Sequence, residues 1–155
     1  MVDREIFSRR LEALHGYLAK LRAFLEADEE EFVREPALHD LAERYLHLAV
    51  EACLDLANHW IADRSLPTPD ANRDTFTILE RAGELSPGSA DRLRGWAGFR
   101  NILVHEYLEI DHSVAYHAIR DELGDLDSFA QWAAEKLSVD GEDSGTSQHR
   151  PSDLS

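Results

Sequence analysis

The sequence has little cysteine and no long apolar run, and each of these absences excludes a class of protein. Cys53 is the single cysteine among 155 residues, so neither a disulfide framework nor a cysteine-based zinc site can form. No stretch approaches the roughly 18 uncharged apolar residues that span a membrane. The first residues include no apolar signal region, so we expect a cytoplasmic protein.

Charge is also unevenly distributed between the two signs. The chain has 31 acidic and 16 basic residues, a formal charge of −15 at pH 7. Only Lys20 and Lys136 are lysines, and the other basic residues are arginines. This charge excludes a generally basic nucleic-acid coat protein, although it leaves room for a local basic site. With 43% hydrophobic and 30% charged residues, the chain can form one packed domain.

Apolar residues recur at helical spacing along most of the chain. Between Phe7 and Leu25 they step by four and three residues, which predicts a long first helix. The acidic run 28–31 is interpreted as a solvated helix end or a loop, and Pro36 marks the start of a second helix that ends near Asp63. Because this second helix is apolar on more than one side, we expect it to be central.

Prolines and capping residues divide the rest of the domain. Residues 65–70 are predicted to form a loop and residues 72–85 a shorter helix. The pair Ser86–Pro87 is typical of an N-cap followed by the first helical position, and this fourth helix is expected to end within 105–107. A fifth helix is predicted over 111–137.

The fold class follows from these segments. Gly124 is expected to kink the fifth helix, and from Ser138 onward no apolar face returns. We therefore predict a helical domain over 1–137 and a disordered, acidic, Gly/Ser-rich tail over 138–155. No strand alternation occurs, so the predicted fold is an all-α bundle of four to five helices.

The segment 92–107 differs from the rest of the chain in charge and in glycine content. From Arg81 to His105, four arginines stand against two carboxylates, which gives a basic island in an acidic chain. A polyanion could be held here and repelled elsewhere. Gly95 and Gly98 are poor helix formers, and a helix that keeps them usually gains close approach to a backbone or a ligand.

Helix geometry both supports and limits a shared site in this segment. Arg100 and Tyr107 are seven residues apart and share a face, and Asn101 and His105 are neighbours four residues apart. Arg100 and His105, however, are separated by roughly 140° around an ideal helix. Either the arginine wraps across, or the helix ends near His105, or a second chain closes the site. We favour a symmetric homodimer in which two copies of this surface meet.

The motif Arg100, four residues, His105, one residue, Tyr107 resembles the R-x4-6-H-x-Y signature of HEPN-domain toxins. In addition, residues 43–59 resemble the second helix of the HepT-like family, and residues 98–107 resemble its motif helix. The resemblance implies a homodimeric, HEPN-like helical bundle that acts as a metal-independent ribonuclease, usually a toxin. It also implies a partner, a nucleotidyltransferase antitoxin of the MntA type.

The resemblance further implies roles for single residues. Arg100 and His105 match the catalytic pair of the family, and Asn101 matches the polar residue that often follows the arginine. In the better understood pairs the antitoxin transfers AMP to the signature tyrosine, which here is Tyr107. We count Asn101, Arg94 and Tyr107 as supporting, phosphate-binding residues, and we expect neither a cofactor nor a metal.

These residue types suit RNA cleavage on chemical grounds as well. A histidine titrates near neutral pH and can deprotonate the 2′-hydroxyl or protonate the leaving 5′-oxygen. A guanidinium holds phosphate oxygens and stabilises the charge that develops on them. Asn101 can orient the histidine or the phosphate, and Tyr107 can donate to a phosphate oxygen or stack on a base.

Two other hypotheses use the same residues without catalysis. The first is a HEPN module that binds a nucleotide or its partner enzyme, and the second is a purely structural helical dimer.

The remaining histidines are scattered along the sequence. His112 and His117 are five residues apart, which is a poor match to the spacing of two metal ligands on one helical face. We therefore predict no metal site.

Overall fold

Helices account for all regular structure in residues 3–147, the part of the chain that the computed structural model describes. The all-α class predicted from the sequence is therefore confirmed for these residues, and none of the described helices is long and apolar enough to cross a membrane. In chain order the elements are α1 (Arg4–Ala23), η1 (Phe24–Glu26), α2 (Glu29–Arg34), α3 (Pro36–Asp63), α4 (Asn72–Arg81), α5 (Pro87–His105), η2 (Tyr107–Glu109), α6 (His112–His117), η3 (Ala118–Glu122) and α7 (Gly124–Ser147).

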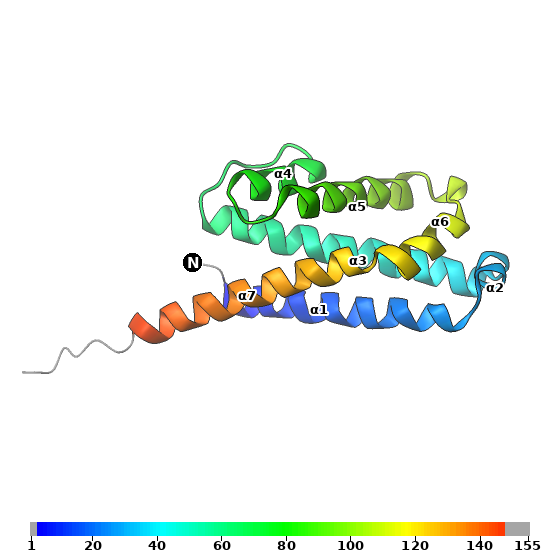
Figure 1. The fold of residues 1–155 in the computed structure, drawn as a ribbon, viewed down its shortest axis with the longest axis horizontal. Helices are drawn as coiled ribbons and strands as arrows, with labels where there is room; N and C mark the ends of the chain where they lie inside the picture. The colour runs from blue at the N-terminus through cyan, green and yellow to red at the C-terminus, as the bar shows by residue number, and fades with distance from the viewer. Residues whose placement is uncertain (1–2, 148–155) are drawn as a thin grey trace, which may run out of the picture.

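The long helices run side by side along one axis. Figure 1 shows α1, α3 and α7 aligned in this direction, with α4 and α5 over α3 and with α2 and α6 together at one end. α1 begins where Asp3 accepts hydrogen bonds from the backbone N–H groups of Glu5 and Ile6. Its apolar stripe faces α3 and α7 and is buried, as the spacing predicts.

α3 is the central helix, as expected. It packs against α1, α4, α5 and α7, so it is buried on several sides. Cys53 is fully buried in its middle, and burial raises the pKa of this thiol. Nearer its N-terminus α3 also buries two polar side chains, His39 and Glu43, on the side where α6 lies.

In the hairpin of α4 and α5, glycine, serine and proline residues determine where one helix ends and the next begins. Gly83 adopts a left-handed conformation, with φ at 78°, and α4 therefore ends at Arg81, before the predicted end of this helix at residue 85. The Ser86 hydroxyl accepts a hydrogen bond from the Ser89 N–H, and Pro87 occupies the first position of α5. The predicted start of α5 is confirmed.

Two segments add to or differ from the sequence-based prediction. The acidic run 28–31 is a solvated helix end, one of the two alternatives, but it begins a short helix that the sequence did not predict: Asp28 caps α2, and Phe32 anchors this helix with a fully buried ring. The predicted fifth helix is divided into α6, the π-helical turn η3 and α7, and Gly124 begins α7. A π-turn shifts the register of the backbone hydrogen bonds, which ends one α-helix and starts the next.

α7 continues to Ser147, so it is helical through 138–147, where the sequence predicts disorder. The physical reason is that each residue added to an existing helix gains one new hydrogen bond, and no proline lies between Pro87 and Pro151 to interrupt the helix. The division into a domain over 1–137 and a tail over 138–155 stays a prediction. Of the predicted tail, residues 148–155 lie outside the described residues.

Candidate functional site

α5 ends at His105, in agreement with one of the alternatives from the sequence. The Glu106 N–H donates to the Ile102 carbonyl at 2.9 Å, and the Glu106 backbone then leaves the helical conformation. His105 is therefore exposed at the last position of the helix. Tyr107, the predicted modification site, begins η2, and its side chain lies outside the described part of the structure.

Arg100 is held in place by side chains from two helices. Its Nε donates to Oε1 of Glu51 on α3, and one terminal nitrogen donates to Oδ1 of Asn101 at 3.2 Å. The Arg100 side chain is 19% exposed. Charge-assisted bonds of this kind are strong and fix the plane of the guanidinium, so the remaining donors keep a defined direction.

Glu51 belongs to a row of polar side chains on α3. Oε1 of Glu51 lies 3.6 Å from Nε2 of His47, and Nδ1 of His47 lies 3.3 Å from a terminal nitrogen of Arg44. Burial lowers the pKa of His47; Glu51 opposes this shift, while Arg100 and Arg44 reinforce it. The ring is therefore neutral at pH 7 and can donate one hydrogen bond and accept another.

A hollow of about 400 Å³ opens between this row and the end of α5. It connects the polar face of α3 to the segment that carries the motif. Its lining residues are Asp40, Glu43, Arg44, His47, Leu103, Val104 and Ile110.

Arg94 lies in a different environment from Arg100. One of its terminal nitrogens donates to Glu80 at 2.9 Å and to Thr77 at 3.3 Å, and both partners are on α4. Six residues separate Arg94 from Arg100, which places them roughly 120° apart around an ideal helix. These contacts join α4 to α5. The predicted phosphate-binding role of Arg94 stays a prediction that its position does not support.

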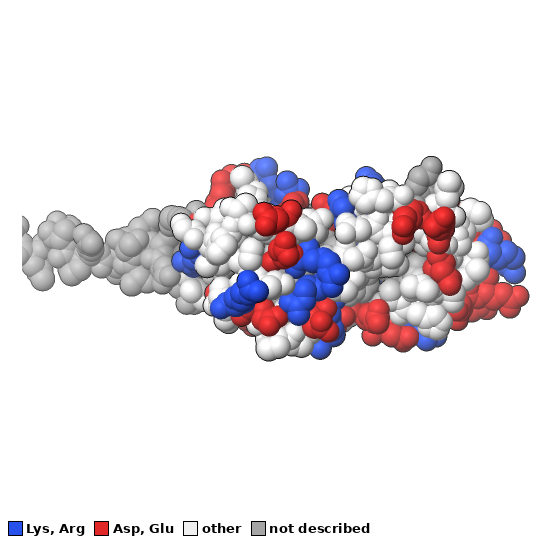
Figure 2. Space-filling model, turned by 90° about the horizontal axis from the view of Figure 1, so that it is seen from above, with Lys and Arg blue, Asp and Glu red and all other residues white. Residues whose placement is uncertain are grey.

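Carboxylates from other helices neutralise much of the predicted basic island. Besides the pairs made by Arg94 and Arg100, Nε of Arg92 lies 3.0 Å from Asp125 on α7. These three carboxylates, Glu51, Glu80 and Asp125, all lie outside the counted segment, so the sequence count missed them. Figure 2 shows basic side chains interspersed with acidic ones on the face above α4 and α5, rather than a continuous basic surface.

The two glycines of α5 lie at an open surface in the described structure. A Cβ at Gly95 or Gly98 would meet no atom within 4 Å. Ile102, seven residues after Gly95 and four after Gly98, is an exposed apolar residue on the same side of the helix. No described part of this chain makes the close approach that these glycines permit.

The structure brings Arg100 and Asn101 together and adds Glu51 and His47, which the motif does not include. In the sequence, Glu51 and His47 are indicated only by being polar side chains four residues apart on an otherwise apolar helix. Together with the exposed His105, the group offers a fixed cation for a phosphate and an imidazole for proton transfer.

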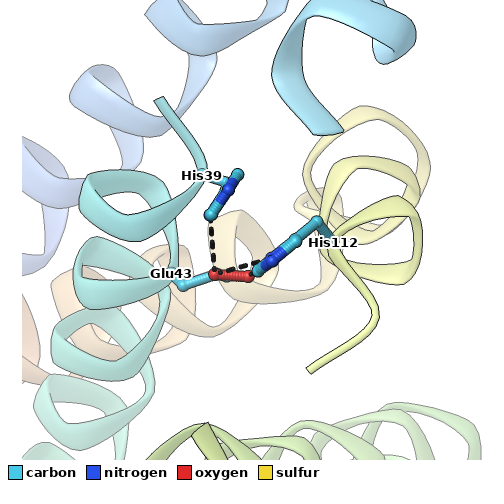
Figure 3. Close-up of side chains that lie close together, drawn as sticks. All are labelled: His39, Glu43 and His112. Carbon is cyan, nitrogen blue, oxygen red and sulfur yellow. Dashed lines mark hydrogen bonds and ion pairs between the residues drawn. The ribbon is translucent and has the colours of Figure 1, made fainter. Parts of the chain in front are cut away.

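A second polar cluster lies nearer the N-terminus of α3. Figure 3 shows His39, Glu43 and His112, the last contributed by α6. Nδ1 of His112 contacts Oε1 of Glu43 directly and lies 3.2 Å from Oε2. Burial raises the pKa of Glu43, while the hydrogen bond from His112 opposes this shift. These three residues are the group in the described structure that could hold a metal ion.

Comparison with protein families gives a match over most of the chain. The family model described as HepT-like, "Ribonuclease HepT-like", matches residues 14–132. The chain is 32% identical to the mRNA nuclease HepT of Shewanella oneidensis over 102 residues, which cover 66% of this chain and 77% of that protein. It is 28% identical to the tRNA nuclease HepT of Aphanizomenon flos-aquae over 118 residues, which cover 76% and 80%.

Solved structures with the same arrangement of helices include toxins bound to antitoxins. The tri-AMPylated Shewanella oneidensis HEPN toxin in complex with the MNT antitoxin superposes with a TM-score of 0.79 at 26% identity, covering 87% of this chain and 99% of that chain. A toxin–antitoxin structure with AMP-PNP gives a TM-score of 0.77 at 26% identity, with coverages of 86% and 99%. YutE of Bacillus subtilis, at 24% identity and a TM-score of 0.76, covers 90% and 93% and shows the shared fold.

Proposed function

The chain belongs to the family of HepT-like ribonucleases, and on this basis we propose that it is the RNA-cleaving toxin of a toxin–antitoxin pair. The observation that carries the proposal is the end of α5. There, an arginine held by Glu51 and an exposed His105 precede Tyr107 at the spacing of the HEPN signature. The similarity to the HEPN toxin bound to the MNT antitoxin supports a partner of the same kind, a nucleotidyltransferase.

The proposed reaction needs no metal ion. The 2′-oxygen of the RNA attacks the adjacent phosphorus, the bond from phosphorus to the 5′-oxygen breaks, and a cyclic phosphate and a 5′-hydroxyl result. Arg100 binds the phosphate oxygens and stabilises the charge of the transition state. His105 accepts the proton of the 2′-hydroxyl, and His105 of the partner subunit in a symmetric dimer protonates the 5′-oxygen.

Replacement of His105 tests the catalytic assignment. His105→Ala should lower the rate of RNA cleavage by about 10²- to 10⁴-fold, which is the usual contribution of a general acid or base. Cleavage of total tRNA and of an mRNA transcript is measured in parallel, and light scattering reports whether the dimer persists. His15→Ala is a suitable control, because His15 is an exposed histidine on α1. A His105→Ala protein that cuts at the wild-type rate would show that the assignment is wrong.

Tyr107 is the proposed point of control by the antitoxin. Its phenolic oxygen attacks the α-phosphorus of ATP, an O–P bond forms, and pyrophosphate leaves. The added AMP places bulk and negative charge beside Arg100, where an RNA phosphate would bind.

Modification is tested by mass spectrometry of the chain co-expressed with its antitoxin. The wild-type chain should carry at least one adenylyl group on the peptide that contains Tyr107. Tyr107→Phe should lack this modification and stay active in the presence of the antitoxin. Inactive wild-type protein with an unmodified Tyr107 would instead indicate inhibition by occlusion.

A further inference from the structure

The cluster of His39, Glu43 and His112 has the dimensions of a metal site. One ligand atom from each residue lies within 4.8 Å of the others. Oε2 of Glu43 is 3.9 Å from Nδ1 of His39 and 3.2 Å from Nδ1 of His112. Bonds of about 2.0–2.1 Å around a tetrahedral zinc ion separate its ligands by roughly 3.4 Å, which lies between these two distances.

His39 supplies an independent observation at the same place. Its side chain is 9% exposed, and its buried Nδ1 makes no hydrogen bond. Oδ1 of Asp40 lies 2.8 Å from this nitrogen but outside hydrogen-bonding geometry, and the Asp40 side chain reaches solvent. A buried nitrogen without a partner is costly to the fold. A metal ion bound between His39 and Glu43 would satisfy it, and Asp40 could complete the coordination.

The ring of His112 has space to rotate, and such a rotation is needed before both histidines can bind one ion. The rings of His39 and His112 are stacked, with centroids 3.5 Å apart and planes inclined by 17°. Because the lone pair of an imidazole lies in the plane of its ring, one ring must turn before both nitrogens can face one ion. The His112 side chain is 27% exposed at the first position of α6, so this ring has space to turn.

We propose that His39, Glu43 and His112 bind a transition-metal ion such as Zn²⁺, which joins α6 to α3. Two imidazoles and a carboxylate are the donor set of zinc and of related divalent ions. The charge of the surroundings also suits a cation, since Asp40 is adjacent and the chain as a whole carries −15.

The proposed site adjoins the candidate active site, because Asp40 and Glu43 also line the hollow at the end of α5, but it uses neither Arg100 nor His105. Glu43 and Glu51 are eight residues apart on α3, which corresponds to about 12 Å along the helix. The ion would nevertheless act on the motif through the chain, because His112 follows His105 by seven residues. Binding would fix the segment 106–111, which begins directly after His105, to the central helix.

Metal binding is tested on the purified full-length chain after removal of metal with a chelator. Calorimetric titration with Zn²⁺ should give one ion for each chain, and thermal unfolding should shift to higher temperature because the ion binds the folded state. Titration with Co²⁺ should give the visible absorption of a site with few ligands, which is a readout independent of RNA cleavage.

Variants identify the ligands. His112→Ala should lose the stoichiometric site, the Co²⁺ absorption and the thermal shift. His117→Ala is the matched control: His117 lies on the same short helix but contacts Glu29, and this variant should bind as the wild type does. Glu43→Gln keeps the size of the side chain and should also lose the metal site. This second variant tests the proposal if circular dichroism shows that His112→Ala is poorly folded. The proposal fails if the wild-type chain binds no stoichiometric ion, or if both ligand variants bind as tightly as the wild type.

Discussion

Glu51 is the residue that connects the signature motif to the rest of the fold. Its carboxylate fixes Arg100 and also lies near His47, so it influences both the direction of the guanidinium and the protonation of the imidazole. We regard Glu51 as a positioning residue, since in the proposed reaction it would act on the phosphate through Arg100.

Glu51→Gln should separate this role from a structural one. Removal of the charge should lower the free energy of unfolding by about 1–3 kcal/mol, because Arg100 loses a charged partner. It should also lower the rate of RNA cleavage by at least about tenfold, because the guanidinium loses its fixed direction.

A matched control for this variant exists in the hairpin of α4 and α5. In the pair of Arg94 and Glu80 the side chains are 21% and 30% exposed, compared with 19% and 32% for Arg100 and Glu51. Glu80→Gln should therefore reduce stability to a similar extent while leaving cleavage unchanged. If the two variants impaired cleavage equally, the effect of Glu51 would be one of stability alone.

The titration of His47 gives a prediction of pH dependence. Burial lowers its pKa below the ordinary value of 6.5, so the unfolded chain binds more protons in the window just below pH 6.5. The folded state therefore loses stability as the pH falls through this window, and the effect vanishes above about pH 7.

Chemical denaturation of the wild type and of His47→Gln between about pH 5 and about pH 7 measures this effect. The difference in unfolding free energy should move in favour of the variant as the pH falls. Burial raises the pKa of Glu43 and gives the opposite slope above pH 4.5, but this contribution is common to both proteins and cancels. A difference that is independent of pH would contradict the shift in the pKa of His47.

At the scale of elements, the glycines of α5 allow a test of whether the outer face of this helix contacts a second copy. Gly98→Ala should stabilise the isolated chain by about 0.5–1 kcal/mol, because alanine favours the helix and no atom within 4 Å opposes its Cβ. If α5 packs on a second copy, the same methyl group should weaken the dimer.

Urea denaturation and sedimentation equilibrium measure the two effects of Gly98→Ala separately. Gly16→Ala on α1 is the control, because a Cβ at Gly16 also meets no atom within 4 Å. We expect this control to stabilise the chain and to leave the association constant unchanged. An unchanged association constant in Gly98→Ala would remove α5 from the predicted interface.

The elements that could be predicted are those with local signals. The Ser86–Pro87 pair marks the start of α5, and Pro36 marks that of α3, because capping and proline geometry depend on adjacent residues. The turn η3 divides the predicted fifth helix without a comparable signal. α2 was missed because the buried ring of Phe32 stabilises it through contacts with α3 and α6, which the acidic run 28–31 does not reveal.

In the candidate site too, residues that form a local motif can be predicted, whereas residues brought together by packing cannot. Arg100, Asn101, His105 and Tyr107 can be identified from the sequence because they form one short motif. The partner of Arg100 cannot, because Glu51 is 49 residues away in the chain and is brought near only by the packing of α3 on α5. His112 likewise meets Glu43 across 69 residues, which is why the sequence predicts no metal site.

At the scale of the whole molecule, charge and assembly are linked. The face over α4 and α5 mixes basic and acidic side chains (Figure 2), and the chain carries −15 overall, so this face of one copy offers RNA no continuous positive surface. A symmetric dimer would double the positive charge at the point where two motifs meet. The predicted homodimer would therefore explain how an acidic protein can bind a polyanion such as RNA.

The burial of Cys53 in the middle of α3 gives this chain an internal reporter. A thiol-specific reagent can reach this sulfur only while the surrounding helices are apart, and no second thiol competes for the label. The labelling rate of the unmodified protein thus reads out the frequency of opening. A cysteine introduced on the outside could meanwhile carry a fluorophore for following the approach of a second copy.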